Sequence, residues 1–173
     1  LFSGCKSEKS GYTRAFIIEN IAEAPGGPGA AAAKGDFLIE NDRAAFVISG
    51  FRGQSSGPAV YPGTLIDADI KRLVYRGGNG QDTIAELFPT VALLMTNPNR
   101  NGDVLVFEDG SNGHSSVISF GEVDDFIEVL ALVPDYGALF SSKAFSVPER
   151  MITVFRLEPG GNTMSLYTFV HSS

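Results

Sequence analysis

The sequence is poor in the residues that build disulfides and metal centres. It has one cysteine, no tryptophan and two histidines, His114 and His171. A single cysteine excludes an internal disulfide, and a histidine-based metal site would need carboxylate ligands as well. Each histidine is therefore interpreted as a strand or loop residue. Long apolar runs are also missing, because the nearest, residues 126–133, includes Glu128 and a membrane helix needs about twenty apolar residues. We expect no membrane-spanning segment.

Positive charge is scarce as well. Thirteen Lys and Arg residues stand against 20 Asp and Glu residues, which gives a net charge of −7 and a pI of about 4.7. An acidic chain is repelled by phosphate backbones, so we expect no nucleic-acid partner. What is present instead is 43% hydrophobic residues, 20 Gly and 9 Pro over 173 residues, which is typical of one folded, turn-rich domain.

The one cysteine lies in a distinctive place. Residues 1–5, Leu-Phe-Ser-Gly-Cys, resemble the end of a bacterial lipoprotein signal peptide, and residues 6–11 are polar, as a tether would be. The resemblance implies that Cys5 is lipidated and anchors the protein in the bacterial cell envelope, outside the cytoplasm. Because the chain lacks an initial methionine and stops after an alternating apolar run, it is interpreted as a fragment. Residues 1–11 are assigned to the lipobox remnant and tether, and 12–173 to one domain truncated at its C-terminus.

The pattern over residues 12–173 predicts mainly short strands. Runs rich in β-branched and aromatic residues alternate with clusters of Gly, Pro, Asn and Asp. These runs are 12–20, 36–40, 44–51, 65–75, 104–107, 117–120, 151–157 and 163–170. The turn residues 41–43 and 158–162 predict two tight hairpins. Strands of this length and spacing favour an all-β fold, an antiparallel β-sandwich.

Two segments are expected to be helical. Thr83 and Glu86 have the spacing of a capping box, and Pro89 would end the short helix that follows. Residues 124–133 carry apolar residues at helical spacing with two acids in the first turn, although a buried strand is the alternative. One or two short helices are therefore predicted within the sandwich.

Two motifs copy functional sites incompletely. Residues 53–57 match the G-x-S-x-G nucleophile elbow, but Pro58 and Pro62 follow where the elbow requires a helix, which favours an exposed loop. Residues 97–108 copy the spacing of a calcium loop, but amides replace carboxylates and Pro98 interrupts the loop. We interpret this segment as an Asn-rich hairpin loop.

Acidic residues are concentrated in one region. From residue 101 to residue 142 there is no Lys or Arg, and eight carboxylates occur there. They are Asp103, Glu108, Asp109, Glu122, Asp124, Asp125, Glu128 and Asp135. Such a face could hold a divalent cation, a cationic ligand or a sugar, whereas a solvated acidic surface is the common alternative.

Four other carboxylates form the candidate binding site. Asp67 and Asp69 lie at alternate positions of one predicted strand, hence on one face, and Asp82 and Glu86 are one helical turn apart. If the intervening loop folds back, all four converge and need a cation, for which their oxygen ligands favour Ca²⁺. Alternatively, nearby basic side chains form ion pairs with the same acids. These are Lys71, Arg72 and Arg76.

Several segments together resemble a known protein class. They are 35–43, 46–48, 55–58, 63–70, 78–82 and 86–89. In this combination they are similar to the N-terminal β-sandwich region of large bacterial surface lipoproteins, which often carry a PHP-type metallohydrolase domain downstream. The hairpin 151–170 is similar to a strand pair of the galactose-mutarotase-like supersandwich. The resemblance covers about residues 12–170.

The resemblance implies an incomplete, supersandwich-like fold and a non-catalytic binding or positioning role in a larger surface protein. It implies carbohydrate and downstream domains of the same chain as partners, with membrane contact only through the lipid anchor. The alternative is the first half of a carbohydrate-active supersandwich enzyme of the epimerase, lyase or hydrolase type. The histidine motifs of the downstream metallohydrolase are missing from this sequence. No residue is therefore assigned a catalytic role.

Overall fold

The computed structural model describes residues 11–51, 61–71, 84, 86–91, 94–125 and 149–171. Nearly all regular structure in these ranges is β. The strands are β1 Thr13–Ile17, β2 Phe37–Asn41, β3 Ala44–Ile48, β4 Leu65–Ile70, β5 Thr90–Val91, β6 Leu94–Asn97, β7 Asp103–Asp109, β8 Ser115–Asp125, β9 Arg150–Leu157 and β10 Met164–His171. One 3-10 turn, η1 Ile21–Glu23, follows β1. No helix in the described ranges is long and apolar enough to cross a membrane.

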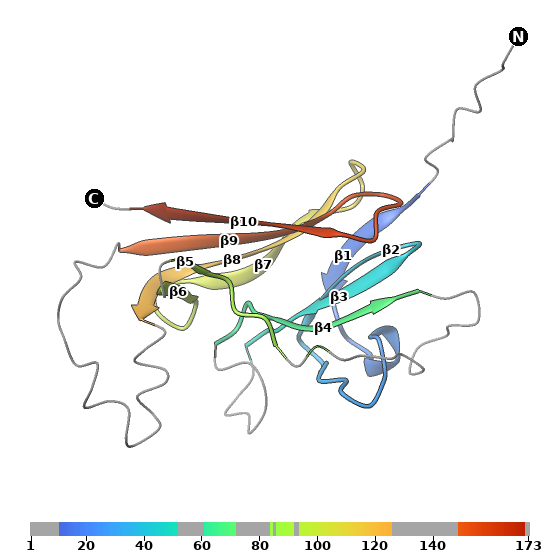
Figure 1. Cartoon of the computed structure of the whole chain (residues 1–173), viewed down its shortest axis with the longest axis horizontal. Helices are drawn as coiled ribbons and strands as arrows, with labels where there is room; N and C mark the ends of the chain where they lie inside the picture. The colour runs from blue at the N-terminus through green and yellow to red at the C-terminus, as the bar shows by residue number, and fades with distance from the viewer. Residues whose placement is uncertain are drawn as a thin grey trace, which may run out of the picture.

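The strands form two antiparallel sheets (Figure 1). The first sheet is a meander in the order β1-β2-β3-β4. The second has the order β10-β9-β8-β6-β5, and β7 is also paired with β8. The predicted all-β, antiparallel sandwich is confirmed, and so are the two predicted hairpins, which are β2–β3 and β9–β10.

A shared apolar core joins the two sheets. Successive residues of a strand point to opposite faces, so alternate residues of the inner strands enter this core. Its fully buried members are Ile39 and Ile48 from the first sheet and Val117, Phe155 and Leu157 from the second. Burial of this apolar surface is the main force that holds the sandwich together.

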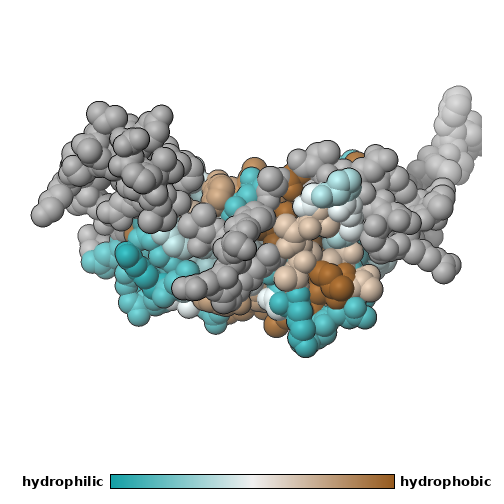
Figure 2. Space-filling model, turned by 90° about the horizontal axis from the view of Figure 1, so that it is seen from below, coloured by the Kyte–Doolittle hydropathy of each residue, from teal (hydrophilic) through white to brown (hydrophobic). Residues whose placement is uncertain are grey.

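The opposite face of the first sheet is covered as well. Its fully buried apolar residues are Ile18, Leu38, Val47 and Ile66. The segment that contains η1 contributes to this cluster and is fastened by the buried Asp36, which accepts the N–H of Ala33 at 2.7 Å and of Gly50 at 2.9 Å. Seen from below, this side of the molecule shows apolar side chains bordered by polar ones (Figure 2).

One buried asparagine ties the turns of the two sheets together. The Oδ1 atom of Asn41 accepts the N–H groups of Arg43 and Ala44, which closes the β2–β3 turn. Its Nδ2 donates to the carbonyls of Glu158 and Gly161 at 2.9 and 2.6 Å, in the β9–β10 turn. The Asn41 side chain therefore joins the ends of both hairpins.

The helix predicted around Glu86 is wrong for the part of that segment that the structure describes. The N–H of Leu87 donates to the carbonyl of Leu65 at 2.8 Å, and the two residues form an isolated bridge. The Glu86 carboxylate accepts the hydroxyl of Thr64 at 2.7 Å. These groups pair with β4 and the residue before it, so the chain is extended here.

The second predicted helix also begins as a strand. Asp124 and Asp125 are the last residues of β8, where they pair with Met95 and Leu94. Residues 126–133, the remainder of that prediction, lie outside the described residues.

The Asn-rich segment is not a hairpin loop, which corrects the interpretation of residues 97–108. The strands on its two sides, β6 and β7, do not pair with each other but pair one after the other with β8. The segment between them passes close over Gly121, where a Cβ atom would lie 2.3 Å from the carbonyl oxygen of Asn97. The segment is therefore a loop that connects two strands, β6 and β7, which lie end to end along the same edge of β8.

Candidate functional site

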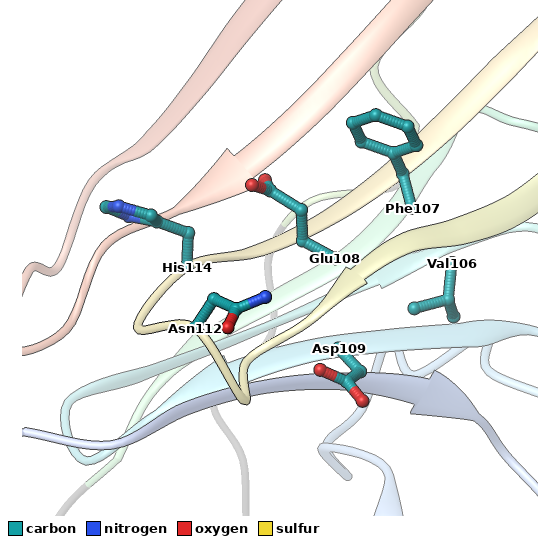
Figure 3. Close-up of a pocket in the computed structure, with 6 residues that line it drawn as sticks. All are labelled: Val106, Phe107, Glu108, Asp109, Asn112 and His114. Carbon is teal, nitrogen blue, oxygen red and sulfur yellow. The ribbon is translucent and has the colours of Figure 1, made fainter.

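A pocket of about 330 Å³ lies at the β7–β8 hairpin (Figure 3). All of its lining residues come from this hairpin. They are Val106, Phe107, Glu108, Asp109, Asn112 and His114. The first four are consecutive at the end of β7, and the other two belong to the turn that leads into β8.

A β-bulge shapes the wall of this pocket. The register between β7 and β8 shifts between Val106 and Glu108, so that Phe107 is an extra residue on β7. Val106 packs against the core, whereas Phe107 is 66% exposed. Bulges re-aim side chains at the edges of sheets, and here the bulge presents an aromatic ring at the pocket beside the Glu108 carboxylate.

The turn after β7 is held against the first sheet. The N–H of Ser111 donates to Oδ1 of Asp109 at 2.8 Å, and the N–H of Gly113 donates to the carbonyl of Gly110 at 3.0 Å. Gly110 has a φ of 104°, and a Cβ atom there would lie 1.9 Å from the carbonyl oxygen of Thr13. Only glycine fits at this approach, so the hairpin end keeps a fixed position beside β1.

The Asp109 carboxyl group has a lowered pKa. The backbone N–H of Ser111 is the largest cause, and the hydroxyl of Ser111 is the next, because both hydrogen bonds favour the charged form. Asp109 therefore stays ionised in mildly acidic solution and remains a hydrogen-bond acceptor there.

An ionic network crosses the second sheet beside the pocket. Glu108, Ser116 and Arg156 face one another on β7, β8 and β9, and the Glu108 carboxylate accepts the Ser116 hydroxyl at 2.8 Å. The Nε atom of Arg156 lies 3.2 Å from Glu158 and 3.8 Å from Glu108. Glu158 in turn lies 2.6 Å from Nδ1 of His114. These contacts position the Glu108 and His114 side chains.

This arrangement is suited to binding a neutral polar molecule. It offers the Glu108 carboxylate, an amide and an imidazole for hydroxyl groups, and an exposed ring for an apolar face, whereas the Asp109 side chain points to the opposite face of the hairpin. Its volume is at the lower end of the range for small-molecule pockets. Within the described ranges, no group of three or more His, Cys, Asp or Glu side chains is arranged to hold a metal ion.

Of the four predicted carboxylates, the structure describes Asp67, Asp69 and Glu86, and Asp82 lies outside the described residues. Asp67 and Asp69 lie in β4, where they pair with Val47 and Ala45 on the face of the first sheet that points away from the second. Both are buried, and Oδ1 of Asp69 accepts the N–H of Ile70. Glu86 contacts Thr64, as described above.

Asp82, Cys5 and the motif at 53–57 lie outside the described residues, as do Arg72 and Arg76. The convergence of four carboxylates on Ca²⁺ therefore stays a prediction, and so does the lipidation of Cys5.

Sequence reasoning missed a buried acid near Asp69. Glu40 is buried on the same face and contacts Arg14, at 2.5 Å, and Lys71. Lys71 also donates to the Tyr12 hydroxyl at 3.1 Å. The pairing of Arg14 with Glu40 depends on the β1–β2 register, which residues 26 positions apart do not reveal.

Four carboxylates of the acidic region that begins at residue 101 form two groups in the structure. Asp124 and Glu122 hold the loop between β6 and β7 in place. Asp124 accepts hydrogen bonds from Nδ2 of Asn97 at 2.6 Å and from Nη1 of Arg100 at 2.8 Å. Glu122 accepts one from Nδ2 of Asn101. These carboxylates have a structural role. Glu108 and Asp109 line the pocket, together with His114, which the sequence analysis assigned no ligand role.

Comparisons of this chain with protein-family models, with curated proteins and with solved structures find no match. The fold and the pocket define an antiparallel β-sandwich with an open polar site on one hairpin. The functional conclusion therefore rests on the geometry of that site.

Proposed function

We propose that this domain is a non-catalytic carbohydrate-binding module of a lipid-anchored bacterial envelope protein. The observation that carries the proposal is the pocket at the β7–β8 hairpin. There an exposed ring, Phe107, lies on the same side of the hairpin as the Glu108 carboxylate, and Asn112 and His114 also line the pocket. A sugar ring has an apolar face of C–H groups and a rim of hydroxyls, and this site offers a partner for each.

A sugar fits this site better than a cation does. The Glu108 carboxylate already accepts a hydroxyl and lies near Arg156, and Asp109 accepts a backbone N–H. Their charges are therefore partly compensated, while oxygen atoms remain for further hydrogen bonds. A hydroxyl can donate to a carboxylate that is already paired, whereas a divalent cation prefers several uncompensated oxygen ligands.

The cellular part of the proposal concerns the N-terminus. Residues 6–11 would connect a lipidated Cys5 to the domain, and the tether would let the module reach ligands beyond the membrane surface. Mass spectrometry of the protein from its native host is expected to show a diacyl or triacyl group on Cys5. An unmodified Cys5 preceded by its intact upstream sequence would contradict the anchor.

The binding proposal is tested by nuclear magnetic resonance. We expect glucose, galactose or N-acetylglucosamine, or a disaccharide of them, to shift amide signals of residues 106–114 in the isotope-labelled chain. Phe107→Ala should weaken that binding about five- to tenfold through loss of the ring contact. Phe51→Ala removes another exposed ring away from the pocket and serves as the matched control.

Two results would overturn the proposal. One is the absence of shifts with every sugar of the panel at millimolar concentration. The other is equal weakening of binding by Phe107→Ala and Phe51→Ala, because the pocket would then contribute nothing specific.

A further inference from the structure

The outermost strand of the second sheet has an open edge. Among the described strands β10 pairs only with β9, and Figure 1 places it at the border of the sheet. From Met164 to Val170 the strand has no Pro, Gly, Lys, Arg, Asp or Glu. Natural proteins guard exposed edges with such residues, because an unguarded edge offers its backbone N–H and C=O groups to another strand. The chemistry of this edge therefore selects an extended strand as its partner.

Apolar side chains are exposed on both faces of β10. Leu166 and Val170, opposite Phe155 and Met151, are on the core side and are 38% and 42% exposed. Tyr167 and Phe169, opposite Val154 and Ile152, are on the outer side and are 48% and 57% exposed. A molecule docked on one face would cover only one of these pairs. A strand added along the edge would contact both pairs at once.

The sequence of β10 is also symmetric in chemical character about Thr168. An aromatic residue lies one position away on each side, Tyr167 and Phe169, and an aliphatic residue two positions away, Leu166 and Val170. A neutral or weakly basic polar residue follows at the third position on each side, Ser165 and His171. An interface with two-fold symmetry requires such a self-complementary surface.

We propose that β10 pairs antiparallel with β10 of a second copy of this chain, with the two-fold axis passing beside Thr168. In this register Tyr167 lies opposite Phe169 of the second copy on the outer face, and Leu166 opposite Val170 on the core face. Each pair occurs twice. Aromatic and aliphatic cross-strand pairs of this kind stabilise antiparallel sheets. No charged residue from Met164 to Val170 opposes the contact, and the two copies form one continuous sheet across the axis.

The register is tested by disulfide trapping in a Cys5→Ser background. Thr168→Cys places the new thiol beside its own symmetry mate, where directly opposite Cα atoms lie about 4.5–5.5 Å apart, within disulfide range. Tyr167→Cys is the matched control, because its symmetry mate is diagonal and about 7–8 Å away. We expect mild oxidation to give a covalent dimer with Thr168→Cys and little with Tyr167→Cys.

Analytical ultracentrifugation of the uncrosslinked chain supplies the second measurement. We expect a reversible dimer that Phe169→Lys weakens at least about tenfold, since it removes two aromatic pairs and guards the edge with charge. Ile17→Lys, at an exposed site on β1, should leave the dimer unchanged, and circular dichroism verifies that both variants fold.

Three outcomes would overturn the proposal. A chain that stays monomeric at its highest soluble concentration excludes a second copy as the partner and leaves the edge to a strand of another protein or of a longer form of this chain. Preferential trapping by Tyr167→Cys excludes the register. A dimer that Phe169→Lys does not weaken lies on another surface. None of these outcomes bears on sugar binding at the β7–β8 hairpin.

Discussion

The two sheets of this domain differ in how many of their faces are buried. The first sheet is covered on both faces, and every residue of β2 is buried, including the acid Glu40. The second sheet buries one face against the first and leaves the other face and the strand β10 exposed, with Ile152, Tyr167 and Phe169 open to solvent. The Glu40 carboxylate inside the first sheet is paired with Arg14 and Lys71, whereas Glu108 and Asp109 of the second sheet line a pocket.

Because of this difference, we assign stability mainly to the first sheet and binding to the second. The first sheet is enclosed and supplies a rigid base against which the β7–β8 hairpin is fixed through Gly110 and Thr13. The second sheet carries the pocket and the open edge, the two surfaces proposed for binding. Surface loops and edges on a rigid scaffold are the usual location of binding residues.

The largest difference between the sheets should appear when apolar side chains are truncated. Leu38→Ala opens a cavity in the covered face of the first sheet and should lower the free energy of unfolding by about 2–5 kcal/mol. Ile152→Ala, on the exposed face of the second sheet, should change it by less than about 1 kcal/mol. Urea denaturation measures both. Equal losses would mean that the outer face of the second sheet is buried in solution, and the comparison would fail.

A second difference should appear when acids are neutralised. Glu40→Gln leaves Lys71 and Arg14 without their buried carboxylate and should cost about 1–3 kcal/mol, reduced from the full cost of a buried pair because Arg14 is largely exposed. Glu158→Gln, in the exposed pair with His114, should cost about 0.5 kcal/mol or less. Urea denaturation measures both free energies of unfolding. A larger loss for Glu158→Gln than for Glu40→Gln would contradict the view that the acid in the first sheet contributes more to stability.

Local turn chemistry made much of the fold predictable. Asn41 both tolerates the turn conformation and caps it with its own side chain, so the sequence 41–43 predicts the hairpin by a mechanism that the structure retains. The Gly-rich turn after Leu157 is a similar case. In both hairpins the strands are neighbours in sequence, and their register follows from the turn.

Predictions made from local signals failed where the structure depends on partners distant in the sequence. The capping-box spacing at Glu86 is a local signal, and pairing of Leu87 with Leu65 overrides it. The Asn-rich segment has residues suited to a hairpin, but β6 and β7 find a common partner in β8, which follows both. No pattern within either segment contains that information.

The candidate site was only partly predictable for the same reason. The acidic region, for which a sugar is one of the expected ligands, includes Glu108 and Asp109. Which of its eight carboxylates line a pocket depends on the bulge at Phe107, and a bulge is a property of two paired strands. His114 joins the site through Glu158, 44 positions along the chain.

The smallest expected effect concerns acid stability and the turn that supports the pocket. Because hydrogen bonds in the folded state lower the pKa of Asp109, its ionised form stabilises the folded state above the unfolded pKa of about 3.9, and this contribution is lost as the pH falls through the folded value. Asp109→Asn removes the titration but keeps a side-chain oxygen for the Ser111 N–H. The stability advantage of the wild-type chain over Asp109→Asn should therefore shrink between about pH 5 and pH 2. Asp103→Asn is the matched control on the same strand, and thermal unfolding across this pH range is the measurement. A difference between wild type and Asp109→Asn that stays constant with pH would show that the Ser111 contacts do not depend on the charge of Asp109.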